Sequence, residues 1–497
     1  MNGSLMRGFL SAGCRKRLLF REIRRGRMRA GPRTHPCPGR SRRYGRRSSR
    51  ADASVTRARP EGRTVVEEGR LEFHPAWDYN YPGRTPASKV SFRAERGTRQ
   101  FPAGSLWDPS LTLKMAISEM SPQKLSIGFV RRGYSASGGA EAYLKRLGRG
   151  AVDLGHGAEL FTTSDWPASE WMFGTMTRLR TTSPIAFADE LEELRPKVRC
   201  DVVMSLERIW RCDVYRAGDG VHRAWLNRRR KFELPLERFT RRLNPKHRDL
   251  LRLEKSLFGD RGAKRIIVNS QMAKDEIVDL YGYPAGKIDI VRNGVPLEKF
   301  RFDPKLREKA REDLKLKPNQ IALLFVGSGW ERKGLLFATE AMALCKNRKM
   351  RLLVAGRGNQ RHYKAKRVQF LGELPDLVRI YAAADIFILP TIYDPFSNAC
   401  LEALACGLPV ITTRANGFSE IVEDGVHGSI IGFPSDIIAL RDAIRFWSDP
   451  SRRIAARSTI IERASQFDIS KNVEKTLAIL IQAAARAAST SGKIWNT

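Results

Sequence analysis

Short apolar runs alternate with longer amphipathic stretches from about residue 124 to residue 413. Apolar runs of four to seven residues bounded by Gly, Pro or polar residues are typical of buried strands, and apolar positions at helical spacing predict helices between them. Alternating strands and helices predict parallel sheets of the α/β class. The predicted strands are 124–130, 158–163, 201–206, 264–269, 288–291, 321–326, 351–355, 368–371, 385–391 and 410–413.

The stretch 385–413, DIFILPTIYDPFSNACLEALACGLPVITT, gives the clearest single unit. Its first strand is followed by a predicted helix from Ser397 to Cys406, because Gly407 lies just past the helical pattern and Pro409 follows. The next strand begins at once. A strand, loop, helix, strand unit has parallel strands, and its loop opens at the carboxyl edge of the sheet, where open α/β sheets bind their ligands.

Two acidic residues mark this unit, Asp394 in the loop and Glu402 about two turns into the helix. Between them, backbone N–H groups near Phe396, Ser397 and Asn398 favour an anion, and a diphosphate is the natural candidate. An ionised Glu402 accepts hydrogen bonds from a sugar or ribose diol. Taken alone, both acids also fit ordinary surface positions, with Asp394 opening an Asp-Pro turn.

A cation pair follows the predicted strand 321–326, in the segment GSGWERKG. Gly327 and Gly329 allow a tight turn, and Arg332 and Lys333 then lie where a helix begins. Two adjacent cations at such a turn suit the neutralisation of a leaving diphosphate without a metal ion. The segment is neither a P-loop nor a dinucleotide fingerprint. Two surface cations remain the alternative.

The loop after the first strand contains Gly138 and Gly139 directly before a predicted helix. Glycines let the backbone approach a ligand closely, although a plain turn explains such a pair equally well. Further along, CDVYRAGDGVHRAWL places Asp219 and His222 in a loop flanked by glycines. A single histidine is more often structural, so the residues alone assign no role to this pair.

Composition separates the N-terminal part from the rest. With 497 residues and 42% hydrophobic content, the chain has room for two domains and additional sequence. Residues 1–114 contain 23 Arg and 3 Lys against 9 acidic residues, which contributes +17 of the net charge of +36. Such a segment is expected to be disordered. It is either a nucleic-acid-binding tail or sequence translated upstream of a true start at Met115 or Met120.

Cysteine usage and hydropathy favour an intracellular protein. The seven cysteines include no CxxC pair, which fits reduced thiols, and no histidine or acidic cluster resembles a metal site. No run approaches the roughly 18 apolar residues that a membrane span needs. Residues 223–248 combine ten basic and two acidic side chains with three aromatic ones. This stretch is either a solvated face or a contact with an anionic membrane surface.

Several motifs recur here in an order that resembles family 4 glycosyltransferases of the GT-B fold, closest to the lipopolysaccharide core glucosyltransferase group. They are the Gly-Gly loop, CDVYRAGDG, VGSGWERKG, AAADIFILP and the two acids eight residues apart, within residues 122–470. The family usually has Glu where this chain has Asp394. The resemblance implies an α/β protein of two Rossmann-like domains facing a central cleft, with the disordered Arg-rich extension in addition.

The expected organisation has five parts. They are a basic extension (1–120), an N-terminal acceptor domain (121–295), a linker (296–318), a C-terminal nucleotide-sugar domain (319–466), and a helix that crosses back to the first domain, with a tail (467–497).

The resemblance also implies a function and a set of site residues. The expected activity is retaining, metal-independent transfer of a hexose, glucose first, from a UDP-sugar to a glycolipid or polysaccharide such as lipopolysaccharide core. Alternatives are a capsular or exopolysaccharide glycosyltransferase with another nucleotide sugar and, more remotely, a basic nucleic-acid-binding protein. The catalytic candidates are Arg332, Lys333, Asp394 and Glu402. The donor-binding candidates are Gly138, Gly139, Gly327, Gly329, Arg357, Leu374, Phe396, Ser397, Asn398 and Leu401. The resemblance further implies that Asp219 and His222 lie on the acceptor side.

Partners and location follow from the same reading. No cofactor or metal is expected, and no nucleic acid is expected for the core. The partners are a UDP-hexose, an anionic glycolipid or polysaccharide acceptor, and an anionic membrane surface that contacts residues 223–248. The expected location is the cytoplasm, with peripheral attachment to the cytoplasmic face of the inner membrane.

Overall fold

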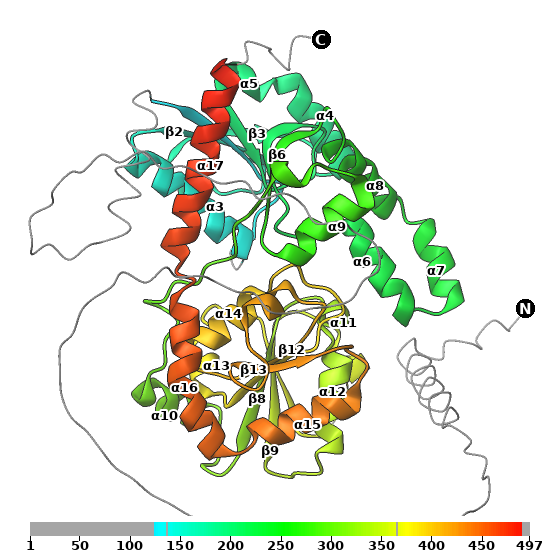
Figure 1. Ribbon diagram of the computed structural model, residues 1–497, viewed down its shortest axis with the longest axis vertical. Coiled ribbons are helices and arrows are strands. Elements are labelled where there is room, and N and C mark those ends of the chain that lie inside the picture. The colour runs from blue at the N-terminus through cyan, green and yellow to red at the C-terminus, as the bar shows by residue number, and fades with distance from the viewer. Residues whose placement is uncertain (1–123, 136–137, 364–365, 490–497) are drawn as a thin grey trace, which may run out of the picture. The chain divides into compact units, whose positions relative to one another are not determined.

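The computed structural model describes residues 124–135, 138–363 and 366–489. All of them belong to one compact unit, which contains two parallel sheets (Figure 1). The predicted disorder of residues 1–120 concerns a segment outside the described residues. We call the part of the chain up to Val295 the first half and the part from Pro296 to Ser465 the second half.

The first half contains a seven-stranded sheet in which every neighbouring pair is parallel. In spatial order its strands are β3 (Gly174–Leu179), β2 (Gly157–Thr163), β1 (Ser126–Val130), β4 (Val202–Ser205), β5 (Cys212–Arg216), β6 (Ala263–Val268) and β7 (Ile288–Ile290). The helices are α3 (Gly139–Asp153), η1 (Ala168–Glu170), α4 (Pro184–Leu194), α5 (Pro196–Arg199), α6 (His222–Arg229), η2 (Arg230–Phe232), α7 (Pro235–Arg242), α8 (Pro245–Leu257), α9 (Gln271–Tyr281) and η3 (Ala285–Lys287).

The second half contains a six-stranded parallel sheet. In spatial order its strands are β10 (Val368–Gly372), β9 (Met350–Ala355), β8 (Ile321–Val326), β11 (Ile386–Leu389), β12 (Val410–Thr413) and β13 (Gly428–Ile431). The helices are α10 (Pro304–Asp313), α11 (Trp330–Lys333), α12 (Leu335–Leu344), η4 (Gln360–Tyr363), α13 (Val378–Ala383), α14 (Asn398–Ala405), η5 (Gly417–Ile421), α15 (Ile437–Trp447) and α16 (Pro450–Ser465).

The two parallel sheets confirm the predicted α/β fold class of two Rossmann-like halves. Three strands had not been predicted: β3, β5 and β13. Strands β3 and β13 lie at sheet edges, so their sequences carry few buried apolar positions. Strand β5 is fully buried but includes Asp213 and Arg216. Asp213 accepts a hydrogen bond from the amide of Val203 and pairs with Lys197 and Lys264, which compensates the buried charge.

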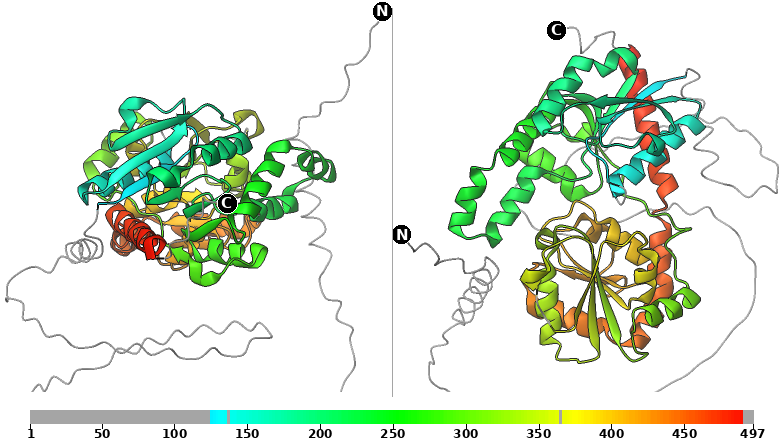
Figure 2. Two further views of the ribbon diagram at one scale, coloured as in Figure 1. Left: turned by 90° about the horizontal axis from the view of Figure 1, so that it is seen from above. Right: turned by 180° about the vertical axis from the view of Figure 1, so that it is seen from behind.

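The last helix returns the chain from the second half to the first. Helix α16 packs on α14 beside the second sheet, and the following helix α17 (Ile469–Ser489) packs on α3 and β4 beside the first (Figures 1 and 2). Val473, Leu477 and Leu480 of α17 are buried in the core on that face of the first sheet. The hydroxyl groups of Tyr143 and Thr476 are 2.8 Å apart, which adds a buried polar contact between α3 and α17.

A buried carboxylate ties the predicted linker segment to the second sheet. Within residues 296–318, helix α10 presents Arg307 and Arg311 to Asp385 at the start of β11, with N–O distances of 2.6 and 3.1 Å. The same carboxylate also accepts a hydrogen bond from the amide of Ala322, at 2.8 Å. The segment between the halves is thus structured, and one carboxylate holds its helix against the sheet.

Replacing this carboxylate tests its contribution. Asp385→Asn leaves the arginines without their buried counter-charge, so we expect a loss of about 3 kcal/mol in the free energy of unfolding, measured by urea unfolding with tryptophan fluorescence. The matched control is Asp313→Asn, because Asp313 pairs with Arg379 on the exposed surface, where an ion pair contributes at most about 1 kcal/mol. Equal losses in the two variants would contradict this account of Asp385.

Candidate functional site

A cavity of about 630 Å³ opens where the carboxyl ends of both sheets meet. This volume is within the usual range for a small-molecule site, and residues from both halves line the cavity. Its basic side chains are Arg131, Arg146, Arg216, Lys299, Arg332 and Lys333, and its acidic side chains are Asp219, Asp394 and Glu402. This excess of positive charge suits an anionic ligand.

The predicted cation pair lies in this cavity, at the end of β8 and in the short helix α11. Lys333 forms an ion pair with Asp394, and both side chains are largely buried. The carbonyl oxygen of Arg332 accepts hydrogen bonds from the amide of Ile392 and from the hydroxyl of Thr391, at 2.8 and 2.9 Å. The loop after β11 is therefore bound directly to the segment that carries the two cations.

The turn before α11 requires glycine. Gly327 and Gly329 have φ angles of +148° and +71°, which L-residues with side chains rarely adopt. Gly327 also lines the cavity, whereas Gly329 does not. The tight turn formed by these glycines thus places Arg332 and Lys333 at the edge of the sheet.

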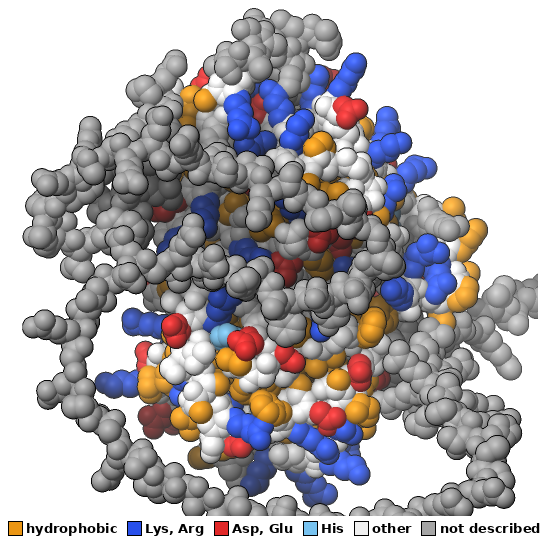
Figure 3. Space-filling view, in the orientation of Figure 1, with side chains coloured by type: hydrophobic (Ala, Val, Ile, Leu, Met, Phe, Trp, Pro, Cys, Tyr) orange, Lys and Arg blue, Asp and Glu red, His pale blue; other side chains and the backbone are white. Residues whose placement is uncertain are grey.

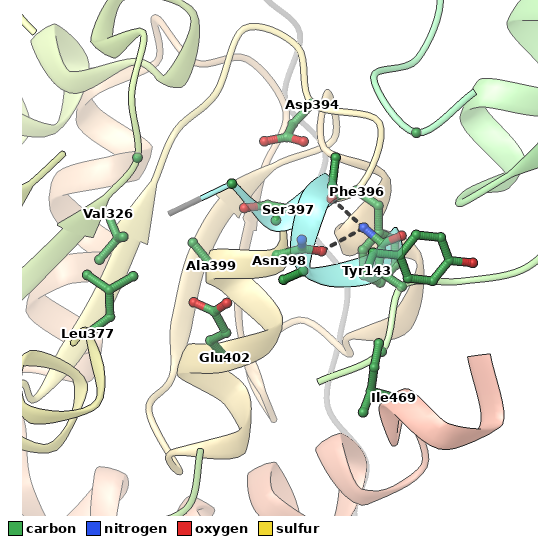
Figure 4. A pocket seen from close by; sticks show the side chains of 18 of the residues that line it. Tyr143, Val326, Leu377, Asp394, Phe396, Ser397, Asn398, Ala399, Glu402 and Ile469 are labelled. Atoms are coloured by element: carbon green, nitrogen blue, oxygen red, sulfur yellow. Dashed lines mark hydrogen bonds between the residues drawn. The ribbon is translucent and has the colours of Figure 1, made fainter. Parts of the chain in front are cut away.

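The two predicted acids lie on either side of the start of α14 (Figure 4). Val326 and Leu377 face them across the cavity (Figure 4). Glu402 accepts a hydrogen bond from the hydroxyl of Tyr381 at 2.8 Å. Burial raises the pKa of Glu402 above its usual value, although the Tyr381 bond and nearby cations act in the opposite direction. The protein therefore holds this carboxyl in a place where its ionisation is costly without a ligand.

The start of α14 differs in one respect from the expectation of free amides at residues 396–398. The amide of Ser397 donates to the side-chain oxygen of Asn416 at 3.2 Å, and the Ser397 hydroxyl accepts from the amide of Cys400. Ser397 is thus the N-cap of the helix and not a free donor. The amides of Asn398 and Ala399 belong to the first turn, which has no intrahelical acceptor, so they are the donors available to an anion.

A polar chain across the cavity was not found from the sequence. Arg216 at the end of β5 donates to the Asn293 side chain at 2.9 Å, and Asn293 donates to the side chain of Asn398 at 2.7 Å. The guanidinium of Arg216 also lies 4.4 Å from the ring centre of Tyr143. Nothing in the local sequence of Asn293 signals this role, because the bonding partners are 77 and 105 residues away.

The glycine loop contacts the same helix start from the first half. A Cβ atom at Gly139 would come within 3.2 Å of the side-chain Nδ2 of Asn398, and one at Gly138 would collide with the carboxylate of Glu141. Glu141 is held by Arg131, whose guanidinium also pairs with Glu207 at 2.6 Å. Both glycines line the cavity.

The predicted site residues divide into two groups. Those that line the cavity are Gly138, Gly139, Asp219, Gly327, Arg332, Lys333, Leu374, Asp394, Phe396, Ser397, Asn398 and Glu402. Those that do not are His222, Gly329, Arg357 and Leu401. Lining residues that sequence reasoning missed include Tyr143, Arg146, Arg216, Asn293, Lys299 and Asn472.

The residues outside the cavity have other surroundings. Leu401 is fully buried in the core of the second half, and Arg357 is exposed and pairs with Glu373. His222 begins α6, and its Nε2 lies 3.1 Å from Nδ1 of His247. Burial, together with the nearby Arg208, lowers the pKa of His222 to about 4. A neutral imidazole bound to a second histidine fits a structural role at the base of α6.

The two parallel sheets and the cavity between them define a protein of the GT-B class. Family models of known sequences match the same two halves. The family described as Glycosyltransferase Family 4 matches residues 137–299, and the family described as Glycosyl transferases group 1 matches residues 320–448. The first match falls within the first half apart from its last four residues, and the second match falls within the second half. The chain belongs to the family 4 (group 1) glycosyltransferases of the GT-B fold.

Individual relatives match over part of their length. The D-inositol 3-phosphate glycosyltransferase 2 of Catenulispora acidiphila is 30% identical over 242 residues, which is 43% of this chain and 55% of that protein. The chain spans about half the length of the curated relatives it matches.

Two solved structures share the fold across nearly their whole length. WaaG, a glycosyltransferase involved in lipopolysaccharide biosynthesis, has a TM-score of 0.62 at 21% identity and covers 71% of this chain and 99% of its own. HepE of Anabaena, in complex with UDP and glucose, has a TM-score of 0.56 at 19% identity and covers 74% of this chain and 100% of its own. At these identities the likeness concerns the fold.

Glu402 offers a test that separates stability from binding. Because the folded state raises the pKa of this carboxyl, stability is lost as the pH rises from the pKa of the unfolded chain through the raised pKa of the folded protein. We expect Glu402→Gln without ligand to melt at a higher temperature than wild type at pH 7 and at nearly the same temperature at pH 4.

The same variant is expected to bind UDP about tenfold more weakly, because a hydrogen bond to a charged group contributes roughly 1.5–3 kcal/mol. Thermal melting at the two pH values and titration calorimetry with UDP are the measurements. A stabilised variant with unchanged UDP affinity would show that Glu402 does not contact the nucleotide.

Proposed function

We propose that this protein transfers a hexose, glucose in the first instance, from a UDP-sugar to a hydroxyl group of an anionic glycolipid or polysaccharide such as lipopolysaccharide core. The observation that carries the proposal is the convergence of two cations, two carboxylates and a helix start in one cavity. The proposal also draws on the family membership and on the UDP and glucose bound by the Anabaena neighbour.

In the proposed arrangement the diphosphate lies between the cation pair and α14. Arg332 and Lys333 take up the negative charge that develops as the leaving group departs, and the amides of Asn398 and Ala399 bind its oxygens. Glu402 accepts hydrogen bonds from the ribose hydroxyls. Leu374 and its backbone neighbours contact the base.

The sugar then lies beside Asp394. This carboxylate forms an ion pair with Lys333, so a diphosphate that attracts Lys333 would release Asp394 to accept hydrogen bonds from sugar hydroxyls. Asp394 is one methylene shorter than the glutamate usual in the family, and we propose that this difference bears on donor choice.

The proposed reaction proceeds with retention at the anomeric carbon and without a metal ion. The bond between the anomeric carbon and the phosphate oxygen breaks, and its electron pair remains on the diphosphate. The acceptor oxygen forms the new bond from the same face, and its proton passes to the leaving phosphate oxygen. The chain's own contribution is to hold the two substrates, stabilise the departing charge and exclude water.

The nucleotide site is tested with UDP and Lys333→Ala. A ligand at one hundred times its dissociation constant stabilises its domain by about 2.7 kcal/mol, which is visible in a melting curve. We expect UDP to raise the melting temperature of the full chain, and we expect Lys333→Ala to reduce that shift strongly because it removes a charge-assisted contact.

Lys309→Ala is the matched control, since Lys309 is exposed on α10 outside the cavity. The melting temperature without ligand is recorded for each variant, because Lys333→Ala leaves Asp394 without its partner. No shift of wild type with UDP, GDP or ADP would contradict a nucleotide-diphosphate site.

We also propose that the protein attaches to an anionic membrane surface through residues 223–248. Helix α7 and the residue that follows it expose three apolar side chains at helical spacing: Leu236 (69% exposed) and Phe239 (60%) in the helix and Leu243 (68%) just past its end. Basic and apolar side chains appear together at the edge of the molecule where α7 lies (Figures 1 and 3). Apolar residues that enter the headgroup region beside lysines and arginines are typical of interfacial helices.

Among the described residues, no helix is both long and apolar enough to cross a bilayer. The test of the membrane proposal compares two phenylalanines of similar exposure, Phe239 on α7 and Phe433 (64%) in the second half. We expect Phe239→Ser to reduce sedimentation with vesicles containing anionic lipid at low salt and Phe433→Ser to leave it unchanged. Failure of the wild-type protein to sediment would refute the attachment.

A further inference from the structure

Tyr393 directly precedes Asp394 in the loop after β11, yet its side chain enters the other half of the protein. It is fully buried within the core cluster on one face of the first sheet, together with Val221, Ala224 and Ile277. In that cluster Tyr393 comes from the second half, whereas the other buried members belong to the first. A single aromatic side chain thus links the loop after β11 to the first half.

Both hydrogen-bonding capacities of the Tyr393 hydroxyl are used. It accepts from the amide of Val221 and donates to a carboxylate oxygen of Glu276, each at 2.8 Å. The other oxygen of Glu276 pairs with Arg228 at 2.8 Å. The ring of Tyr393 stacks with Trp225 and lies 5.3 Å from the Arg228 guanidinium. A hydroxyl with a donor and an acceptor fixed on opposite sides leaves the tyrosine little freedom to move.

The surrounding backbone is shaped for this side chain. A side chain at Gly220 would come within 2.4 Å of the Tyr393 hydroxyl, and Gly220 has a φ angle of +72° that also favours glycine. Gly218 and Asp219, in the same short loop, line the cavity on its acceptor side. The loop 218–221 therefore contacts the cavity with its first residues and Tyr393 with its last two.

The neighbouring residue Asp394 is fixed to the second half by its backbone. Its amide donates to the carbonyl of Ala415 at 3.0 Å, and its carbonyl accepts from the amide of Gly417 at 2.9 Å. Its carboxylate faces Lys333 in the cavity. Of these two consecutive residues, Tyr393 contacts the loop 218–221 of the first half and Asp394 faces the cavity.

We propose that Tyr393 is a positioning residue that couples the acceptor-side loop 218–221 to the donor-sugar carboxylate Asp394. This inference rests on the proposed function for its meaning. When the loop and the tyrosine are engaged, the position of Asp394 is set by both halves, so the sugar subsite is complete only while the halves are together. The nucleotide contacts of the second half do not depend on Tyr393. The coupling thereby confines sugar binding to the arrangement that excludes water.

The substitution that tests this is Tyr393→Phe, which keeps the ring and removes only the hydroxyl. Val221 loses its acceptor, whereas Glu276 keeps Arg228 as a partner. We expect the dissociation constant of UDP to stay within about twofold of wild type. We expect UDP-glucose to bind about tenfold more weakly, the change that corresponds to about 1.4 kcal/mol. Calorimetry with UDP and with UDP-glucose gives both values.

The matched control is Tyr283→Phe. Tyr283 is also buried in the first half and donates to the carbonyl of Ala263 at 2.8 Å, but it does not line the cavity. It reports the cost of losing a buried tyrosine hydroxyl without a link between the halves. We expect the control to bind UDP and UDP-glucose like wild type. Equal weakening of both ligands in Tyr393→Phe, or weakening of neither, would overturn the proposal.

Hydrogen exchange provides a readout that needs no ligand. In Tyr393→Phe we expect the amides of both Val221 and Asp394 to exchange at least about tenfold faster than in wild type and in Tyr283→Phe, because a freed loop opens more often. Faster exchange at Val221 alone would show that the two residues are not coupled. Wild-type protein that binds no UDP would contradict the proposed function, and the exchange measurement would still decide the coupling.

Discussion

The arrangement of this molecule depends on one property of parallel sheets: all strands end at the same edge. Arg216 ends β5, the turn with Gly327 follows β8, and the loop with Asp394 follows β11. Each of these segments therefore reaches the cavity without any special path of the chain. The helices that follow begin at the same edge, so α14 also brings its unpaired amides to the cavity. Position is decided by topology, and only the choice of side chain is left to the local sequence.

The charges in the cavity are incompletely compensated before a ligand arrives. Lys333 and Asp394 neutralise each other, and Glu402 is held by Tyr381, a neutral partner. Among the described residues, Arg216 and Arg332 form no ion pair with a carboxylate. Buried charges without a counter-charge lower the stability of the fold. Such a cost is expected where a residue is retained for binding a ligand and not for folding. The diphosphate proposed here would supply the missing negative charge, so the donor would complete the electrostatics of the fold.

Sequence patterns predicted all strands but three: β3 and β13, which lie at sheet edges, and β5, which lies inside the first sheet. The core strands β8 and β11 are continuous apolar runs, and the fully buried β12 consists of β-branched residues, so their signal comes from burial on both faces. Strand β5 was missed because Asp213 is buried but neutralised by residues far away in the chain. Distance along the chain also separates the site residues that the sequence predicted from those that it did not. Arg332, Lys333, Asp394 and Glu402 stand in compact motifs, whereas Asn293 owes its place to tertiary contacts.

The contacts between the halves are of two kinds, polar contacts at a helix start and a broad apolar contact. Besides Tyr393, Glu420 of η5 accepts hydrogen bonds from the first amides of α9, at 2.9 and 2.8 Å, and pairs with Arg292 at 2.6 Å. These are polar contacts at a helix start, which water replaces at modest cost when the halves separate. The broad apolar contact is different, since α17 packs its buried face on the first sheet.

This division has a mechanical consequence. The chain crosses between the halves near Val295 and again before α17, and Val295 pairs with Asp468 as an isolated bridge. Gly294 lies against Ile469, where a side chain would come within 2.5 Å of the Ile469 backbone. The two crossings are therefore adjacent, and a pair of adjacent strands of chain bends more easily than a packed interface. Opening at this point would break the Tyr393 and Glu420 contacts while α17 keeps its place on the first sheet.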